Sequence, residues 1–460
     1  MHAEDSLSDL TQPQLFPDDR WVCFSHNAHR VWHPARKYPE AVIRADRRWE
    51  YGPHFQPAAY GTFLRQADRF RAWYVAAGRV GYAESDDGVH WDKPEVGLYE
   101  IDGSHRNNVV LVEGPYIDNI SVIETPDDQA WPLKALYWAS QGADGKPGIC
   151  LARSADGIRW ERQGRILNWG DRFNAVTRRV NGKFLLFGRD DVVYPAASKG
   201  RVVVRSESED LVNWAPARLV LQTDLDDPVC MQSYSLAAFP YSDLLLGGFE
   251  RMYFAPDKVD TEIVWSRDAG CTWRRSAHRP RFIEWGLRDT WDSQWISLPS
   301  NPPIRQGNRL FFFYSGRFST HGDVDPQRLA AIGIATLRLD GFCSLHSGPK
   351  AGAVVTPTMT WPGGDLLLNF DARHDLEAHP SQTASGMLKV EVRDEADKPL
   401  PGYALDAFTP QCINTANLPG CYAPIQWKDC KSLKELAGRR VRFCFVLRDC
   451  HLYAFKASSV

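Results

Sequence analysis

Residues 262–273 read EIVWSRDAGCTW, an apolar strand that runs into the turn Ser266-Arg267-Asp268-Ala269-Gly270-Cys271-Thr272-Trp273. Three earlier stretches resemble it: ESDDGVHW (84–91), RSADGIRW (153–160) and RSESEDLVNW (205–214). Their tryptophans, Trp91, Trp160, Trp214 and Trp273, are 69, 54 and 59 residues apart. An aspartate in such a turn can accept backbone hydrogen bonds, and a tryptophan can pack between sheets. The stretch therefore predicts a repeated Asp-box turn, which sets the architecture rather than the chemistry.

Apolar strands surround each copy of the turn. A short strand leads into it, and a stronger apolar strand comes before that, at 69–76, 133–140, 183–189 and 243–250. A fifth unit follows at 293–342, with Asp340-Gly341-Phe342 in place of the turn. Only 431–440 is a candidate helix. Units of three or four antiparallel strands cannot bury both their faces alone, and a ring of blades buries them without leaving free sheet edges.

The predicted fold is therefore all-β, with a five-bladed β-propeller over residues 41–350. After about residue 350 the repeat stops and alternating strand patterns continue, which predicts a β-sandwich over 351–460. Residues 1–40 are expected to complete the propeller or to pack on the sandwich. The alternative is one large β-sandwich in which the tryptophan spacing is a coincidence.

Composition excludes several classes of partner. The 460 residues carry a formal net charge of −3 without a long run of one sign, which argues against nucleic acid and anionic membranes. The sequence contains no run of about 18 apolar residues, so no membrane span is predicted. Residues 1–20 lack the apolar core of a secretory signal, so a cytoplasmic location is expected, or a secreted one if a leader was removed.

The cysteine pattern predicts no zinc site. The ten cysteines include no C-x-x-C pair, and no ligand cluster points to another metal or to a cofactor. Reduced thiols are expected in the absence of a signal peptide. Five cysteines between 412 and 450 leave a disulfide in the C-terminal part open.

Acids and arginines recur with the period of the predicted blades. Asp118, Asp171, Gln232 and Asp292 stand at the starts of predicted inner strands, 53, 61 and 60 residues apart. Arginines and further acids end the second strands. Because these strand ends meet at one face of a propeller, the side chains are expected to line one funnel. Carboxyl groups held close in a partly dry site raise one another's pKa, and glycoside hydrolysis needs one protonated and one ionised carboxyl group.

The candidate catalytic residues are accordingly Asp118, Asp171, Asp190 and Glu250. The candidate substrate-binding residues are Glu50, Asn174, Arg189, Tyr234, Arg251, Trp291, Asp292, Arg317 and His321. Simpler interpretations stay open. Asp118 and Asp171 could be solvated loop acids, Asp190 could pair with Arg189, and any one of the aromatic side chains could belong to a core.

The five units, the Asp-box strand ends, Arg189-Asp190-Asp191 and the C-terminal sandwich resemble the five-bladed propeller glycosidases of glycoside hydrolase families 32 and 43. Stretches such as DGVHWDKPEVGLYE and VEVRDEADKPLPGY are more closely similar to bacterial family-32-like proteins. The resemblance implies that Asp118 is nucleophile or base, that Asp171 or Asp190 stabilises the oxocarbenium-like charge, and that Glu250 is the acid. The invertase signature Asn-Asp-Pro-Asn is absent near the N-terminus, so a fructoside substrate is not expected.

The predicted function is a glycoside hydrolase, or a related glycan-processing enzyme, with a carbohydrate substrate. One alternative is a sialidase-like enzyme that grips a carboxylate with Arg189, Arg251 and Arg317. Another is a non-catalytic glycan-binding propeller, and a remoter one is a protein-interaction scaffold. The sandwich is a candidate surface for self-association.

Overall fold

The computed structural model describes residues 9–52, 56–168, 170–193, 199–299, 301–322, 330–372, 386–407, 413–428 and 432–459. These residues form an all-β protein with several sheets. Its helical elements in the described ranges are single 3-10 turns: Asp19–Trp21, Arg48–Glu50, Leu405–Ala407, Thr415–Asn417, Pro419–Cys421 and Leu433–Leu436. The candidate helix at 431–440 is therefore reduced to one 3-10 turn, followed by a strand that begins at Arg440. No helix in the described part of the chain is long and apolar enough to cross a membrane.

The chain divides into two compact units. Unit 1 comprises Met1–His33, Arg305–Leu310 and Leu337–Val460, and unit 2 comprises Pro34–Ile304 and Phe311–Thr336. The boundary therefore falls between Thr336 and Leu337, and the predicted boundary near residue 350 lies inside unit 1. The first forty residues contribute to both units.

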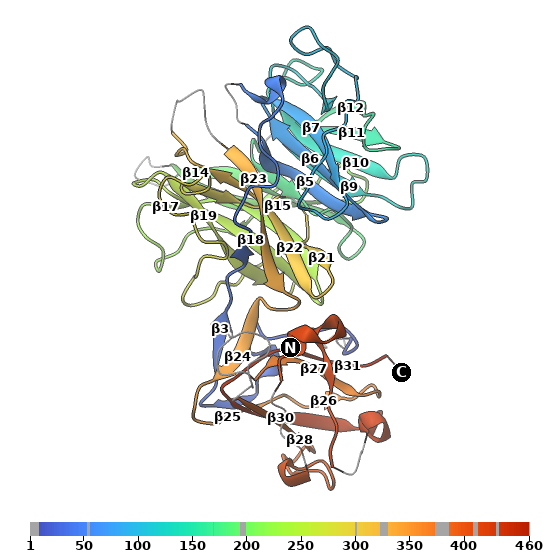
Figure 1. Ribbon diagram of the computed structural model, residues 1–460, viewed down its shortest axis with the longest axis vertical. Helices are drawn as coiled ribbons and strands as arrows, with labels where there is room; N and C mark the ends of the chain where they lie inside the picture. The colour runs from blue at the N-terminus through green and yellow to red at the C-terminus, as the bar shows by residue number, and fades with distance from the viewer. Residues whose placement is uncertain are drawn as a thin grey trace. The chain divides into compact units, whose positions relative to one another are not determined.

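Unit 2 consists of antiparallel sheets that follow one another along the chain (Figure 1). Three sheets have four strands: β5–β8 (Ala58–Gln66, Arg69–Ala76, Arg79–Ser85, Val109–Leu111), β9–β12 (Ile117–Glu124, Leu133–Ala139, Gly148–Ser154, Glu161–Leu167) and β13–β16 (Phe173–Ala175, Phe184–Val193, Lys199–Ser208, Arg218–Leu221).

An eight-stranded sheet completes unit 2. One part of it is β17–β19 (Met231–Tyr241, Leu244–Tyr253, Lys258–Ser266), and the other is β20, β21, β22 and β23 (Trp295–Ser297, Ile304–Gln306, Arg309–Arg317, Ala330–Arg338) with β4 (Arg36–Lys37). A single parallel pair, Val259 with Trp295, joins the two parts. The N-terminal strand β4 pairs with β23, so residues from both ends of unit 2 share this sheet.

The predicted Asp-box turns are present in the structure, four times with one hydrogen-bond pattern. The serine hydroxyl accepts a backbone N–H at 2.8–2.9 Å, and the aspartate Oδ1 accepts backbone N–H groups at 2.7–2.9 Å. The tryptophan Nε1 donates to a carbonyl of the same turn at 2.9–3.2 Å. Leu211 takes the place of glycine in the third copy, with a φ of 68°.

Each of these tryptophans packs on a sheet other than its own. Trp160 meets Trp73 of β6 with ring centroids 6.4 Å apart, and Trp273 meets Phe187 of β14 at 5.6 Å. Trp91, from the first sheet, packs edge-on against Phe313 of β22 at 5.6 Å. Trp214 packs on the core that the second and third sheets share. The turns thus bind each sheet to the one before it, and the first sheet to the last.

The first strands of the sheets are also linked by side-chain hydrogen bonds. Val122 N donates to Thr62 Oγ1 at 2.9 Å, Ala175 N to Ser121 Oγ at 3.1 Å, and Asn174 Nδ2 to Ser235 Oγ at 2.8 Å. These bonds join β5, β9, β13 and β17 in order. Ala59 N donates to Ser315 Oγ at 2.6 Å and so joins β5 to β22.

Gly157 tests how tightly a turn fits against the neighbouring sheet. Its φ is +75°, and a Cβ there would lie 2.6 Å from the Trp73 ring. Gly182 also has a positive φ, +78°, but a Cβ there meets nothing within 4 Å. We expect Gly157→Ala to lower the free energy of unfolding by about 2–4 kcal/mol, because overpacking adds to backbone strain. Gly182→Ala should cost about 1 kcal/mol, since only the strain remains. Urea denaturation of both variants measures the difference, and equal losses would contradict a close fit.

Unit 1 is built from two sheets. One contains β1 (Gln14–Leu15), β3 (His29–Trp32), β24 (Cys343–Ser347), β27 (Leu366–Asp371), β29 (Ala423–Pro424) and β31 (Cys450–Ala457). The other contains β2 (Phe24–His26), β25 (Gly352–Val355), β26 (Met359–Thr360), β28 (Met387–Arg393) and β30 (Arg440–Arg448). Phe443 and Phe445 of β30 contact Phe455 of β31, with ring centroids 6.2 and 6.1 Å apart, so the two sheets share one core.

Four histidines gather in the first of these sheets. His346 stacks on His451 at 3.9 Å, His29 meets His346 at 5.3 Å, and His33 meets His451 at 5.3 Å. The Ser344 hydroxyl lies between two of them, 2.9 Å from His33 Nε2 and 2.8 Å from His451 Nδ1. Burial lowers the pKa of His33 to about 4 and that of His451 to about 2. The His33 and His451 rings are therefore neutral in the folded protein at pH 7.

The eight cysteines in the described ranges are free thiols. They include Cys421, Cys444 and Cys450 of the C-terminal group. Cys412 and Cys430 lie outside the described residues.

Candidate functional site

The first strands of three sheets are irregular, each near one end. In β9, Asp118 and Asn119 lie opposite the single residue Trp138 of β10. In β17, Tyr234 is an extra residue between the pairs Ser233–Arg251 and Ser235–Glu250. In β5, the register shifts between Ala58 and Thr62, around Tyr60. Such bulges re-aim side chains and are common next to active sites. Here they set the positions of Asp118, Tyr234 and Tyr60.

Asp118 is the best-placed carboxyl group for proton transfer. Its side chain is partly exposed, and its pKa is raised to about 6, chiefly by burial and also by the negative charge of Asp171. Arg172, Arg189 and Arg317 act in the opposite direction. Among the described residues, no donor forms a hydrogen bond with the Asp118 carboxyl group. Its protonation state is therefore governed by burial and by the surrounding charges.

Asp171 is exposed and forms an ion pair with Arg189. It lies two residues before β13, while Arg189 lies on β14. The Arg189 guanidinium also lies over the Tyr234 ring, 5.0 Å from its centroid. Asp171 is thus fixed beside Asp118 and reachable from solvent.

Glu250 is fully buried at the end of the apolar run in β18. Its Oε1 accepts hydrogen bonds from Arg172 Nη2 at 2.8 Å and from Ser297 Oγ at 2.5 Å. Its Oε2 is buried and has no hydrogen-bond partner among the described residues. Arg172 is 2% exposed and lies over the Tyr60 ring at 3.9 Å. This buried group connects two of the sheets, because Arg172 directly precedes β13, whereas Glu250 of β18 and Ser297 of β20 belong to the eight-stranded sheet.

An aromatic group surrounds the same arginines. Arg317 donates to Tyr60 Oη at 3.0 Å and lies over the Trp295 ring at 4.2 Å. His321 stacks parallel to Trp295 at 5.4 Å and meets Tyr234 edge-on at 5.7 Å. Burial lowers the pKa of His321 to about 4, and the positive charges of Arg317, Arg201 and Arg189 contribute to this shift. We name the group formed by Tyr60, Asp118, Asp171, Arg172, Arg189, Tyr234, Glu250, Trp295, Arg317 and His321 the first-strand cluster.

Two partly exposed aromatic residues lie next to the carboxyl groups. Tyr116 and Trp138 are in ring contact, with centroids 5.7 Å apart. Burial raises the pKa of Tyr116, and the charges of Asp118 and Asp171 raise it further, which places the phenol close to both acids. This pair offers an apolar surface beside the Asp118 carboxyl group.

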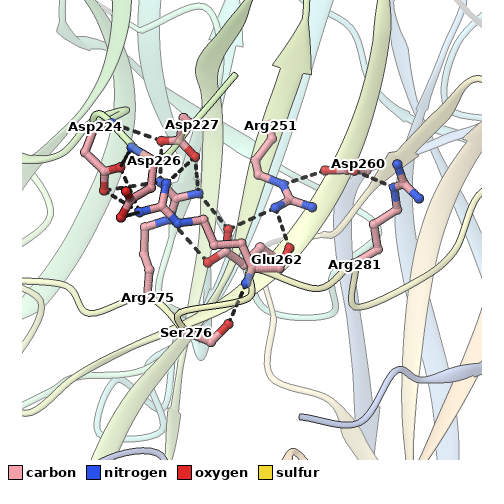
Figure 2. Close-up of polar contacts among 10 residues, drawn as sticks. Asp224, Asp226, Asp227, Arg251, Asp260, Glu262, Arg275, Ser276 and Arg281 are labelled. Atoms are coloured by element: carbon pink, nitrogen blue, oxygen red, sulfur yellow. Dashed lines mark hydrogen bonds and ion pairs between the residues drawn. The ribbon is translucent and has the colours of Figure 1, made fainter. Parts of the chain in front are cut away.

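The structure does not bring Arg251 to the first-strand cluster. Figure 2 shows its guanidinium between Asp260 and Glu262, at 2.7 Å and 3.1 Å. Glu262 in turn pairs with Arg275, which also binds Asp227 at 2.6 Å (Figure 2). The reason is strand alternation: Glu250 and Arg251 are consecutive in β18, so their side chains point to opposite faces. Arg251 belongs to a separate, closely paired charge network.

Three further predicted residues make their contacts elsewhere. Glu50 is buried, with Lys93 Nζ 2.7 Å and Tyr74 Oη 2.6 Å from its Oε1. Asp292 accepts from Lys37 Nζ at 2.7 Å and from Tyr314 Oη at 2.9 Å. Trp291 stacks on Tyr314 with centroids 5.5 Å apart. A structural role explains Glu50 and Asp292, because buried charges need partners, and Trp291 packs on a residue that binds Asp292.

Two further predicted residues, Asp190 and Asn174, make contacts that neither support nor contradict a role in the site. Asp190 is exposed on β14 and accepts a hydrogen bond from Asp191 N. Asn174 is buried, and its side chain donates to Ser235 Oγ, which links β13 to β17. A catalytic role for Asp190 and a binding role for Asn174 stay predictions.

Sequence reasoning missed several members of this site: Tyr60, Tyr116, Trp138, Arg172, Arg201 and Ser297. Arg172 directly follows the predicted Asp171, and Gly61 within the strand AAYGTF is a signal of the bulge at Tyr60. The other four carry no local signal. No group of three or more His, Cys, Asp or Glu side chains in the described ranges could hold a metal ion.

No protein-family model matches the chain, and no curated protein matches it. Solved structures show a likeness at low identity. An N-acetylgalactosamine deacetylase from F. plautii, in complex with blood group B trisaccharide, is 16% identical with a TM-score of 0.47, over 69% of this chain and 96% of that chain. A thermostable family-43 glycoside hydrolase is 15% identical with a TM-score of 0.46, over 68% and 96%. An α-L-arabinofuranosidase from Podospora anserina, in complex with cellotriose, is 13% identical with a TM-score of 0.45, over 65% and 95%. At these identities and scores the likeness does not assign the chain to a family.

Proposed function

We propose that the chain is a glycan-active enzyme, a glycoside hydrolase or a related glycan-processing enzyme, that acts from the first-strand cluster. The fold that we propose for it is a five-bladed β-propeller with an appended β-sandwich. The closed series of contacts supports a ring: each Asp-box tryptophan packs on the preceding sheet, and Trp91 returns from the first sheet to β22. The hydrogen bond from Ala59 to Ser315 closes the same circle along the first strands.

The raised pKa of Asp118 beside Asp171 is the observation that carries the functional proposal. Glycosidic bond cleavage needs one carboxyl group that donates a proton and a second that stays ionised. Asp118, with a pKa of about 6, suits the first role. Asp171 suits the second, because it is exposed and paired with Arg189. This assignment differs from the one implied by the family resemblance, in which Glu250 was the acid.

Glu250 takes a positioning role in this proposal. It is fully buried and holds Arg172, whose positive charge acts on Asp118. Loss of the Glu250 charge would free Arg172 and change the field at Asp118. Glu250 therefore influences proton transfer through Arg172.

Tyr116 and Trp138 are proposed to stack on a sugar ring, since a partly exposed aromatic face suits the apolar face of a sugar. We expect Trp138→Leu to raise KM about 2–15-fold with little change in kcat, because an aromatic contact contributes about 0.5–1.5 kcal/mol beyond its buried area. Trp131→Leu is the matched control: it lies before β10, at the opposite end of that strand from Trp138. Steady-state kinetics of the two variants would contradict the stacking role if they gave the same KM.

A sialidase-like enzyme is the second candidate. The positive charges of Arg172, Arg189 and Arg317 all lower the pKa of the Asp118 carboxyl group, so three arginines act on one site. Arg172 would replace Arg251 in the predicted trio. A non-catalytic glycan-binding propeller is the third candidate, and it needs the same aromatic surface without proton transfer.

Turnover assays on aryl furanosides, pyranosides and sialosides test the three candidates with the full-length protein. Hydrolysis of a neutral glycoside supports the first candidate, and hydrolysis restricted to sialosides supports the second. Saturable glycan binding without hydrolysis of any substrate would support the third and contradict the enzyme. The control is Asp118→Asn, which should remove hydrolysis and leave glycan binding in place.

A further inference from the structure

Arg189 and Arg201 lie on one face of the third sheet, on neighbouring strands. Arg189 is two residues before Asp191 in β14, and Asp191 pairs directly with Arg201 of β15. Residues two apart in a strand share a face, so the two arginines lie on a diagonal of this face. Both guanidiniums lie over the same ring, with their Cζ atoms 5.0 and 5.5 Å from the centroid of Tyr234.

Among the described residues, no acidic side chain lies within ion-pair distance of the Arg201 guanidinium. Its Nη1 points to Met252 Sδ at 2.8 Å, a weak acceptor for a charged donor. Arg189 pairs with Asp171 and also interacts with the Tyr234 side chain, while its Nη1 is buried and has no hydrogen-bond partner among the described residues. The guanidiniums of Arg189 and Arg201 are thus two partly buried positive charges close together, with N–H groups that could donate further hydrogen bonds.

The surroundings give this place an excess of positive charge. Burial lowers the pKa of Arg201, and the neighbouring charge of Arg189 lowers it further, which shows that the two guanidiniums repel each other. The positive charges of Arg201 and Arg317 also lower the pKa of His321, whose ring contacts Tyr234 edge-on. The negative groups acting on Arg201 are Asp191 and Asp171, both exposed. Bringing two like charges together costs free energy, which an anion bound between them would recover.

We propose that Arg189 and Arg201 form a subsite for an oxyanion over Tyr234, with His321 at its border. The ligand chemistry is a planar or tetrahedral group of negatively charged oxygens, which matches the fixed donors of guanidinium groups. Two sources share this chemistry: the carboxylate of an acidic sugar and inorganic phosphate. The inference that the anion belongs to a substrate rests on the proposed function. The inference that an anion binds here does not.

Isothermal titration calorimetry on the full-length protein tests the subsite without turnover. The probes are inorganic phosphate and glucuronate, with glucose as the neutral counterpart and chloride to keep the ionic strength constant, because salt screens such contacts. We expect saturable binding of phosphate or of glucuronate and none of glucose. Tighter binding of glucuronate identifies an acidic sugar, and tighter binding of phosphate identifies the free anion.

Arg201→Gln should raise the Kd of the preferred anion at least about tenfold, since charged hydrogen bonds are lost. Arg106→Gln is the matched control, because Arg106 is 81% exposed and pairs only with Glu95 among the described acids. Arg201→Lys keeps the charge and much of the packing, and should bind with intermediate affinity if Arg201→Gln fails to fold. The subsite is refuted if neither anion binds the wild type, or if the Arg201 variants bind as tightly as the wild type.

Asp118→Asn separates this inference from the proposed function. The variant should lose turnover and still bind the anion. Anion binding by a wild-type protein that hydrolyses no glycoside would support the subsite and contradict the enzyme. Hydrolysis of neutral glycosides with no anion binding would support the enzyme and overturn the subsite.

Discussion

Asp118→Asn is expected to lower kcat for glycoside hydrolysis by about 10²–10⁴-fold, the usual contribution of a general acid. The melting temperature should stay nearly unchanged, because in the described structure no hydrogen bond or ion pair depends on this carboxyl group. Asp68→Asn is the matched control, since the Asp68 side chain is fully exposed. Steady-state kinetics and thermal melting of both variants measure the effect.

The pH profile provides a second test of the same role. A general acid must be protonated in the reactive form, and burial and Asp171 raise the pKa of Asp118 to about 6. The value of kcat/KM should therefore fall as the pH rises through about 6. Asp171→Asn removes the neighbouring negative charge and should also lose turnover, so the Asp118 titration is followed in it by carboxyl NMR and should move to lower pH. An unchanged Asp118 titration in Asp171→Asn, or full activity in Asp118→Asn, would contradict the assignment.

Unit 1 is expected to loosen in mild acid because of its histidines His33 and His451. His33 and His451 have folded-state pKa values of about 4 and about 2, below the ordinary 6.5. A histidine whose folded pKa is lowered stabilises the fold above its unfolded pKa, and this stability is lost as the pH falls through 6.5 toward the folded value. At pH 5 the loss is about 2 kcal/mol for each ring relative to neutral pH. The loss for the two rings together is about 4 kcal/mol.

Hydrogen exchange of the full-length protein at pH 7.5 and pH 5 measures this effect, after correction for intrinsic exchange rates. Protection should fall in β3, β24 and β31, which carry the histidines, and should hold in β5 and β6 of unit 2. His451→Gln should reduce the pH dependence in these strands. His105→Gln, an exposed histidine of unit 2, should leave it unchanged. Equal protection of β24 and β31 at both pH values would refute the prediction.

The repeating part of the fold could be predicted because its signal is local. Each Asp-box turn is closed by hydrogen bonds within a few residues, such as Thr272 N to Asp268 Oδ1 at 2.9 Å. The turn can therefore be predicted from a short stretch of sequence. The spacing of these turns indicated the sheets, and the same spacing led to Asp118 and Asp171. The involvement of the N-terminal segment in both units has no comparable signal, because its strands are short and their partners lie hundreds of residues away.

The site was predictable only in part, for two physical reasons. Arg201 and Trp138 owe their positions to strand pairing and to a bulge, which spacing along the chain does not reveal. The inclusion of Arg251 beside Glu250 overlooked a rule that was available, namely that consecutive strand residues face opposite ways. Glu50 and Asp292 are acids whose partners, Lys93 and Lys37, are likewise fixed by tertiary contacts.

The pairing of β4 with β23 has a consequence for how the protein is made. Residues 36–37 leave the ribosome almost 300 residues before their partners at 335–336. At about 5–20 residues per second, translation leaves this segment waiting for about 15–60 s. Strand β1 waits longest of these, since its partner β31 comes at the end of the described chain, whereas β2 and β3 pair with β25 and β24. The nascent N-terminus is therefore the part of this protein most in need of a chaperone during synthesis.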